Sequence, residues 1–392
     1  MANYNFDTVT ERRGTNSLKW DVREGELPMW VADMDFPVAP EILAAVKKRA
    51  EHGVFGYTVL PDEWYAAYIG WWKECHGFEM KKSWLMFCTG VVPAISSAVR
   101  KLTTPNENVL VQTPVYNIFF NSIENNGRRV LEAPLKYDGE NYSVDFAELE
   151  KKLADPQTTL MILCNPQNPS GKVWDAATLA KIGELAYDNH VTVIADEIHC
   201  DLTDPDCAYV PFASVSEKCH MNSVTCIAPT KAFNIAGLQT AAISVPNANL
   251  RHKIWRAINT DEVAEPNSFA VDAAIAAFTA GGGWLDALRQ YIFENKALVS
   301  DFIAREISQL RLVPSQATYL LWLDCSRIKA GSCEVAKLIR RETGLYLSNG
   351  EAYRGDGANF LRMNIACPRA VLQDGLARLK KGCEIAEREF NK

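Results

Sequence analysis

The chain has 392 residues, of which 48% are hydrophobic and 23% are charged, and its formal net charge is −7. This composition is typical of a folded globular protein, and the length predicts about two domains. The acidic balance, without a basic stripe, argues against nucleic acid as a partner.

The first residues, MANYNFDTVTERRG, lack the apolar segment of a secretory signal. No apolar run elsewhere is long enough to span a bilayer. The eleven cysteines contain no Cys-x-x-Cys pair, and several lie in apolar runs, so we expect reduced core thiols in a cytoplasmic protein. The six histidines show no ligand spacing with one another or with cysteine, so the sequence predicts no metal site.

The middle of the chain alternates short β-branched segments with longer helical ones. The expected strands are 109–112, 159–163, 191–195, 223–227 and 241–245, and the expected helices include 94–102, 176–189 and 269–280. This alternation predicts an α/β domain with a largely parallel sheet.

A second, smaller unit is expected after the glycine triplet 281–283, which we expect to end a helix. A long helix from about 285 to 310 is followed by strand 319–323, helix 334–342, strand 360–365 and helix 371–387. We therefore predict a large sheet domain at 46–285 and a small α+β domain at 286–392. Residues 1–45 are expected to join the small domain and to line the cleft.

Polar residues follow the expected strands of the large domain. Tyr116 follows the first strand, Asn168 the second, Asp196 and His199 the third, and Lys231 the fourth. Each alone has a plainer interpretation, as a core aromatic, a turn, a helix cap or a solvated amine. Because open parallel sheets bind ligands at the carboxyl ends of their strands, we expect the set to face one cleft.

This set matches the needs of pyridoxal 5′-phosphate (PLP). The Lys231 amine can form a Schiff base with the aldehyde, and a buried Asp196 can keep the pyridine nitrogen protonated. The Asn168 amide can donate to the phenolic oxygen, and Tyr116 can stack on the ring. The phosphate suits the helix N-terminus that residues 89–91 open.

These motifs resemble the fold-type I PLP enzymes, the class I and II aminotransferase superfamily, over nearly the whole chain. The resemblance rests on Asn168 in Asn-Pro-Ser-Gly, Asp196 in Ala-Asp-Glu-Ile-His and Lys231 in Ala-Pro-Thr-Lys-Ala-Phe-Asn. It implies an aspartate aminotransferase-like fold, with a mostly parallel seven-stranded sheet sandwiched by helices in the large PLP-binding domain. Arg362, in Phe-Leu-Arg-Met-Asn-Ile, resembles the residue that binds the substrate α-carboxylate together with Asn168. A guanidinium suits this task because it can bind both carboxylate oxygens.

Five further segments resemble the cystathionine β-lyase and cystalysin type of C–S lyase. They are 30–36, 55–58, 89–93, 196–199 and 231–237. The resemblance implies cofactor contacts from Gly90 and Val91, and from His199 and Thr230. It also implies that Tyr57 reaches the phosphate of the partner subunit, and hence a homodimer with active sites shared across the interface.

Some positions differ from the broader superfamily. Ala228 replaces a phosphate-binding Ser, Gln239 a phosphate-binding Arg, and His199 a Tyr that contacts the phenolic oxygen. The lyase subgroup tolerates all three, so they argue against a standard aminotransferase. Asn117 stands where some lyases have a second Tyr.

We therefore predict α,β-elimination of L-cystathionine or related S-substituted L-cysteines to pyruvate, ammonia and a thiol. Lys231, Asp196 and Tyr116 are the expected catalytic residues, with Lys231 as general base. One alternative is an aminotransferase, which shares the early steps. Another is a PLP-fold regulatory or binding protein, against which intact Lys231, Asp196 and Arg362 argue.

Overall fold

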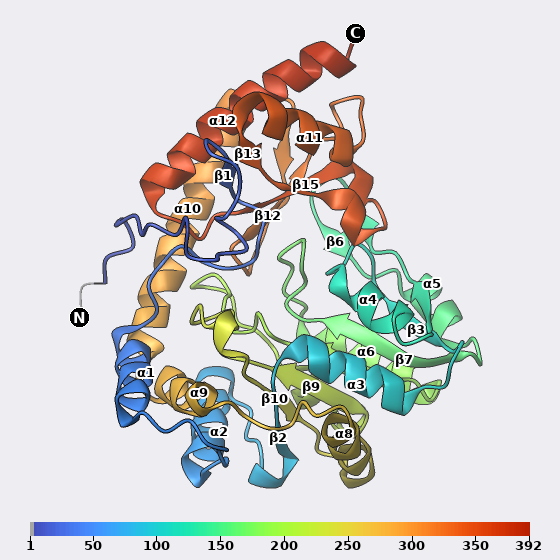
Figure 1. Ribbon diagram of the computed structural model, residues 1–392. Coiled ribbons are helices and arrows are strands. Elements are labelled where there is room, and N and C mark those ends of the chain that lie inside the picture. Colours follow the sequence, from blue (N-terminus) through green and yellow to red (C-terminus); the bar gives the residue numbers. More distant parts are fainter. Residues whose placement is uncertain (1–3) are drawn as a thin grey trace.

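A seven-stranded sheet forms the centre of the computed structural model, which describes residues 4–392 (Figure 1). Its strands, in spatial order, are β2 (Leu85–Cys88), β10 (Ala241–Ser244), β9 (Ser223–Ile227), β8 (Thr192–Asp196), β7 (Thr158–Cys164), β3 (Asn108–Val111) and β4 (Arg129–Glu132). β10 is antiparallel to both of its neighbours, and all the other pairs from β9 to β4 are parallel. The expected mostly parallel seven-stranded sheet is confirmed.

Helices cover both faces of this sheet. They are α3 (Val91–Leu102), α4 (Ile118–Glu124), α5 (Phe146–Leu153), α6 (Ala176–Asp188), α7 (Glu217–Met221) and α8 (Ala248–Thr260). In β7, Leu160 and Ile162 pack in the core that contains α3 and α8, whereas Met161 and Leu163 pack in the core that contains α5 and α6. Burial on both faces explains why the central strands are continuous apolar runs.

Three more helices flank the sheet domain and lead out of it: α1 (Pro40–His52), α2 (Asp62–His76) and α9 (Ser268–Ala280). α10 (Gly282–Glu306) follows α9 directly and extends toward the smaller unit (Figure 1). Gly281 does end α9, but Gly282 and Gly283 already belong to α10, so the helix expected from about 285 begins earlier.

The C-terminal part contains a four-stranded antiparallel sheet in the order β11 (Arg311–Leu312), β12 (Leu320–Asp324), β15 (Phe360–Asn364) and β14 (Ser348–Asn349). Helices α11 (Ser332–Thr343) and α12 (Arg369–Phe390) pack together beside it. β1 (Leu27–Pro28) pairs in parallel with β13 (Leu345–Tyr346), so the N-terminal segment is attached to this part. β5 (Lys136–Tyr137) and β6 (Tyr142–Ser143) form a separate antiparallel ribbon. The boundaries 45 and 285 themselves remain predictions.

Among residues 4–392, no single helix is both long and apolar enough to cross a membrane. Only α9 and α10 taken together satisfy the length and composition criteria, and they are bent by 76° relative to each other.

Candidate active site

The strand register brings distant residues to one edge of the sheet. Cys88, the last residue of β2, lies opposite Ala241, and Ala242 lies opposite Ile227, the last residue of β9. β2 therefore runs in the same direction as β9 and ends at the same edge. As a result, the segments that follow β2, β7, β8 and β9 all emerge on one side of the sheet.

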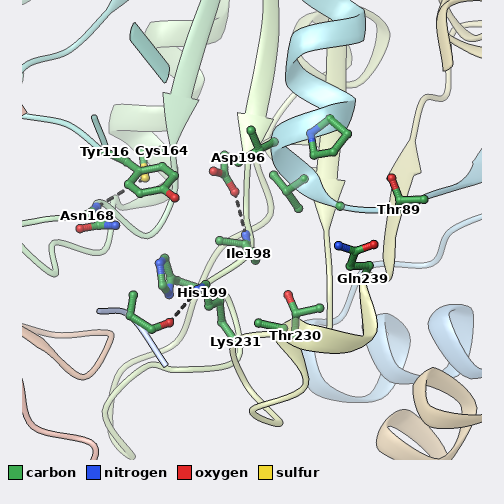
Figure 2. A pocket seen from close by; sticks show the side chains of 16 residues that line it. Thr89, Tyr116, Cys164, Asn168, Asp196, Ile198, His199, Thr230, Lys231 and Gln239 are labelled. Atoms are coloured by element: carbon green, nitrogen blue, oxygen red, sulfur yellow. Dashed lines mark hydrogen bonds between the residues drawn. The ribbon is translucent and has the colours of Figure 1, made fainter. Parts of the chain in front are cut away.

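A cavity of about 300 Å³ lies at this edge (Figure 2). Eight of the ten predicted site residues line it: Gly90, Val91, Tyr116, Asn168, Asp196, His199, Thr230 and Lys231. In Figure 2, Tyr116 and Asn168 lie on one side of the view and Thr89 and Gln239 on the other, with Asp196 between them. Arg362 and Tyr57 are not among the lining residues.

Asp196 is a buried carboxylate with few contacts that offset the cost of burying its charge. Its side chain is 4% exposed, and Oδ1 accepts a hydrogen bond from the Ile198 N–H at 3.1 Å. Burial raises the pKa of Asp196 to about 7, opposed by this hydrogen bond and by the charge of Lys231. A cationic nitrogen in the cavity would stabilise the charged carboxylate, which is the partner that a protonated pyridine ring needs.

Lys231 follows β9 and directs its amine into the same cavity. Nζ donates a hydrogen bond to the Ala32 carbonyl at 2.7 Å (Figure 2). Burial lowers the pKa of Lys231 to about 8, although the charge of Asp33 opposes the shift. The amine is therefore neutral far more often near pH 7 than a surface lysine, as a nucleophile or a general base must be.

Arg362 is hydrogen-bonded to Asn168, which lines the cavity. Arg362 is 5% exposed; its Nη1 donates to Asn168 Oδ1 at 3.1 Å and its Nη2 donates to the Trp30 carbonyl at 3.0 Å. The guanidinium also lies 5.0 Å from the ring centre of Tyr353. Because Asn168 Oδ1 is engaged, its amide nitrogen is the group that remains to donate into the cavity. Arg362 Nε is buried without a hydrogen-bond partner, which leaves a donor for an anionic group.

Tyr116 and His199 complete this part of the cavity as uncharged groups. Burial raises the pKa of the Tyr116 hydroxyl to about 12, so it remains protonated. Burial lowers the pKa of His199 to about 3, with the charges of Lys231 and Arg362 adding to the effect. His199 is therefore a neutral imidazole, and its buried Nδ1 has no hydrogen-bond partner.

The opposite end of the cavity suits a phosphate. Gly90 is the N-cap of α3 and supplies no side-chain cap, so the first backbone N–H groups of the helix remain to bind an anion. A Cβ at Gly90 would lie 3.2 Å from Pro93 Cδ, a tight contact that the absence of a side chain avoids. Thr89 and Gln239 also line the cavity, and Gln239 provides an amide at the position where the broader superfamily has a phosphate-binding arginine.

The residues present thus fit PLP in each of its parts. The cavity offers an amine for the aldehyde, a buried carboxylate for the ring nitrogen, an amide for the phenolic oxygen and a helix N-terminus for the phosphate. His199, which lines the cavity, has a buried Nδ1 without a hydrogen-bond partner, and Arg362, which is hydrogen-bonded to the lining residue Asn168, has a buried Nε without one. Residues 28–379 match the family model described as aminotransferase class I and II. The chain belongs to this family.

Members of the aminotransferase class I and II family that are similar to this chain include several named lyases. Cystathionine beta-lyase PatB of Bacillus subtilis is 43% identical over 383 residues, covering 96% of this chain and 99% of the relative. The crystal structure of cystalysin from Treponema denticola, which contains PLP, has a TM-score of 0.94 at 31% identity and covers 98% of this chain and 100% of that one. The PLP-bound C–S lyase from Staphylococcus hominis has a TM-score of 0.90 at 32% identity, with coverage of 97% and 98%.

Three further residues contribute to the site although the sequence did not predict them. The Ala32 carbonyl holds Lys231, Cys164 lines the cavity beside Asn168, and Tyr353 packs on Arg362. Ala32 lies within the segment 30–36 that was noted only for its resemblance. Cys164 ends β7 and is an ordinary apolar core residue by its sequence context, so no local signal marked it.

Tyr57 is the predicted site residue that stands apart. It lies in the segment 53–61 between α1 and α2, and its side chain is fully exposed. It therefore contributes nothing to the cavity of its own chain, and its predicted contact with a partner subunit remains a prediction.

Proposed function

We propose that this chain is a PLP-dependent carbon–sulfur β-lyase that acts on L-cystathionine or related S-substituted L-cysteines. The observation that carries the chemistry is the convergence of Lys231 and Asp196 in one cavity, with Tyr116 and Asn168 beside them. The choice of elimination over amino transfer is supported by the 43% identity, along nearly the entire chain, with a cystathionine beta-lyase. The similarity to cystalysin and to a C–S lyase of known structure supports the same choice.

PLP, when bound, withdraws electrons from the Cα atom of the attached amino acid and so makes its proton acidic. Asp196 would face the ring nitrogen and keep it protonated, because its buried charge is stabilised by a neighbouring cation. Tyr116 would stack on the ring, and the amide nitrogen of Asn168 would donate toward the phenolic oxygen. The N-terminus of α3 at Gly90 and Val91, together with Thr230, would hold the phosphate.

Arg362 would bind the α-carboxylate of the substrate, and its present contacts favour this role. The hydrogen bonds to Asn168 and to the Trp30 carbonyl fix the guanidinium plane, while Nε remains available. Lys231 Nζ would then accept the Cα proton as general base, and its lowered pKa suits that transfer near neutral pH. The same amine, once protonated, can deliver the proton to the departing sulfur, so that a thiol leaves and pyruvate and ammonia follow by hydrolysis.

We also propose a homodimer in which Tyr57 completes the phosphate site of the partner. Three other apolar side chains of the same segment are well exposed: Val54, Phe55 and Val59. Hydrophobic residues gathered on one short exposed segment are typical of a protein interface. Such an interface would place Tyr57 against a second copy of the chain.

The cytoplasmic location and the domain limits 1–45, 46–285 and 286–392 belong to the same proposal. All eleven cysteines are unpaired, as is usual in a reducing compartment.

The reaction type is tested with a panel of L-cystathionine, S-alkyl-L-cysteines and L-alanine, in the presence and absence of an added 2-oxo acid. Pyruvate and thiol are measured separately. We expect pyruvate and thiol in equal amounts from the sulfur amino acids without any 2-oxo acid. L-Alanine, which has no sulfur to eliminate, should give no pyruvate under the same conditions. Robust amino transfer that depends on the 2-oxo acid, with negligible thiol release from every sulfur substrate, would show that the chain is an aminotransferase.

A further inference from the structure

A second cavity, of about 400 Å³, shares no lining residue with the first. It lies where the end of α2, the segment after β8 and the start of α10 meet, and His76, Cys200 and Asp201 line it. One possible ligand atom from each of these three side chains lies within 4.8 Å of the others. Within residues 4–392, this is the one group of three or more such side chains that is close enough to share a metal ion.

Asp201 has an unsatisfied atom at this position. The residue is 6% exposed, and its Oδ1 accepts hydrogen bonds from Trp71 Nε1 and His76 Nε2, both at 2.8 Å. Its other oxygen, Oδ2, is buried and has no hydrogen-bond partner. A buried carboxylate oxygen without a partner is costly and uncommon, and a cation in the cavity would satisfy it.

The surroundings favour a cation as well. Asp206 and Asp286 also line the cavity, and the one arginine there, Arg289, is hydrogen-bonded to the backbone and hydroxyl of Thr203 and to the Asp204 carbonyl. Asp286 lies 3.6 Å from Arg289 in an ion pair at an exposed position, where solvent screens the interaction. The cavity lining thus carries three carboxylates against one guanidinium, and its carboxylates outnumber its arginine.

The ligand types identify the class of metal. An imidazole nitrogen, a thiolate and a carboxylate are the donor set of zinc, which accepts three protein ligands and a fourth from water or another side chain. Calcium and magnesium prefer oxygen ligands only and do not suit a thiol. Since no further His, Cys, Asp or Glu ligand atom of residues 4–392 belongs to this group, the fourth ligand would be water.

We propose that His76, Cys200 and Asp201 bind one zinc ion. Bonds form from zinc to an imidazole nitrogen, to Cys200 Sγ and to Asp201 Oδ2, while the thiol proton of Cys200 passes to solvent. No electron is transferred. The ion would tie the last turn of α2 to the segment that follows β8. His199, the residue before Cys200, lines the first cavity, so the ion would fix the position of the backbone that carries His199.

The test uses the PLP-loaded protein after treatment with a chelator and removal of free cofactor. Zinc is titrated in, and bound metal is counted by mass spectrometry; cobalt is used in parallel, because a cobalt–thiolate bond gives a charge-transfer absorption band that oxygen or nitrogen ligands do not give. We expect about one zinc per chain, a cobalt–thiolate band, and a rise in melting temperature on adding zinc. The band must come from a thiolate, so metal held by the cofactor cannot imitate it.

Cys200→Ser should abolish the band and lower the zinc affinity at least tenfold. Cys333→Ser, a partly buried thiol in α11, is the matched control and should leave both unchanged. Asp201→Asn keeps an acceptor for Trp71 and His76 but loses the charge, so it provides a second variant should the serine protein fail to fold; it should also weaken zinc binding at least tenfold. Failure of the wild type to bind zinc, or a band and affinity that survive in both variants, would overturn the proposal. Because the readouts are metal content and absorption, the result is independent of the reaction type.

Discussion

Replacement of Asp196 by Asn is expected to separate the stability of the protein from its activity. The variant keeps an oxygen that can accept the hydrogen bond from Ile198 N–H but removes the buried charge. Without cofactor, that charge has no close cation other than Lys231. We therefore expect the variant to be more stable than the wild type when the cofactor is absent, and much less active when it is present.

The magnitude follows from the pKa. Burial raises the pKa of Asp196 from 3.8 to about 7, and one pH unit corresponds to about 1.4 kcal/mol. Because the folded pKa is raised, the cost is absent well below pH 4, grows as the pH rises from about 4 to 7, and is constant above. The Asn variant of the cofactor-free protein should thus gain about 2 kcal/mol at pH 5 and about 4 kcal/mol at pH 8. With cofactor, loss of one partner of a buried ion pair costs about 3–5 kcal/mol, or at least about 10²-fold in turnover.

Glu197→Gln is the matched control. Glu197 is also fully buried, and burial raises its pKa to about 7, but it does not line the cavity and instead accepts hydrogen bonds from Tyr209, Phe212 and Asn165. Urea unfolding of the cofactor-free proteins at pH 5 and pH 8 measures stability, and pyruvate release measures turnover. The control should retain turnover within about threefold. Turnover of Asp196→Asn near the wild-type level, or an equal loss in Glu197→Gln, would refute the assignment of Asp196 to the ring nitrogen.

Three further substitutions test the remaining assignments. Lys231→Ala should lose the visible absorption band of the bound cofactor, and borohydride treatment should no longer link cofactor to protein; a link that persists would show that another amine is involved. Equal mixing of inactive Tyr57→Ala and Lys231→Ala subunits should restore up to about a quarter of wild-type activity, since one site in each hybrid dimer is intact, whereas no recovery after verified exchange of subunits would contradict shared sites. Arg362→Lys loses the forked contact and should raise KM for the amino-acid substrate by roughly 10–100-fold, while Arg354→Lys, at a more exposed ion pair with Glu124, should leave KM unchanged.

The strands that are buried on both faces could be predicted from the sequence. β9 was predicted with its observed bounds, and the limits of β7 and β8 were each within one residue. β2 was missed because Leu-Met-Phe-Cys contains no β-branched residue. β4 was missed because Arg-Val-Leu-Glu lies at the sheet edge, partly exposed, and has no clear period. The helix N-terminus expected at residues 89–91 is confirmed, but the helix span expected from 94 began three residues late, because a proline such as Pro93 is tolerated in the first turn.

The site was predictable where it depends on the ends of parallel strands, since those ends converge on one edge. The site was not predictable where it depends on contacts between residues that are far apart in the sequence and do not lie at strand ends. The Ala32 carbonyl and Lys231 are 199 positions apart, and their contact depends on the pairing of β1 with β13, which attaches the N-terminal segment to the C-terminal part. His76 and Asp201 are 125 positions apart, so the absence of local ligand spacing, on which the prediction of no metal site rested, says nothing about them.

The charges of the candidate active site explain why the protein and its cofactor depend on each other. The same burial raises the pKa of Asp196 to about 7 and lowers that of Lys231 to about 8, so near neutral pH each group is neutral far more often than it would be at the surface. Both shifts destabilise the folded protein when no cofactor is bound. The raised pKa of the carboxylate lowers stability at pH values above about 4, and the lowered pKa of the amine lowers stability at pH values below about 10. A ligand that brings a cationic nitrogen to Asp196 and takes up the Lys231 amine removes both costs at once. Binding therefore stabilises the fold most strongly at the pH where these two groups do their chemistry, and a ligand that lacked either feature would leave one of the two costs in place.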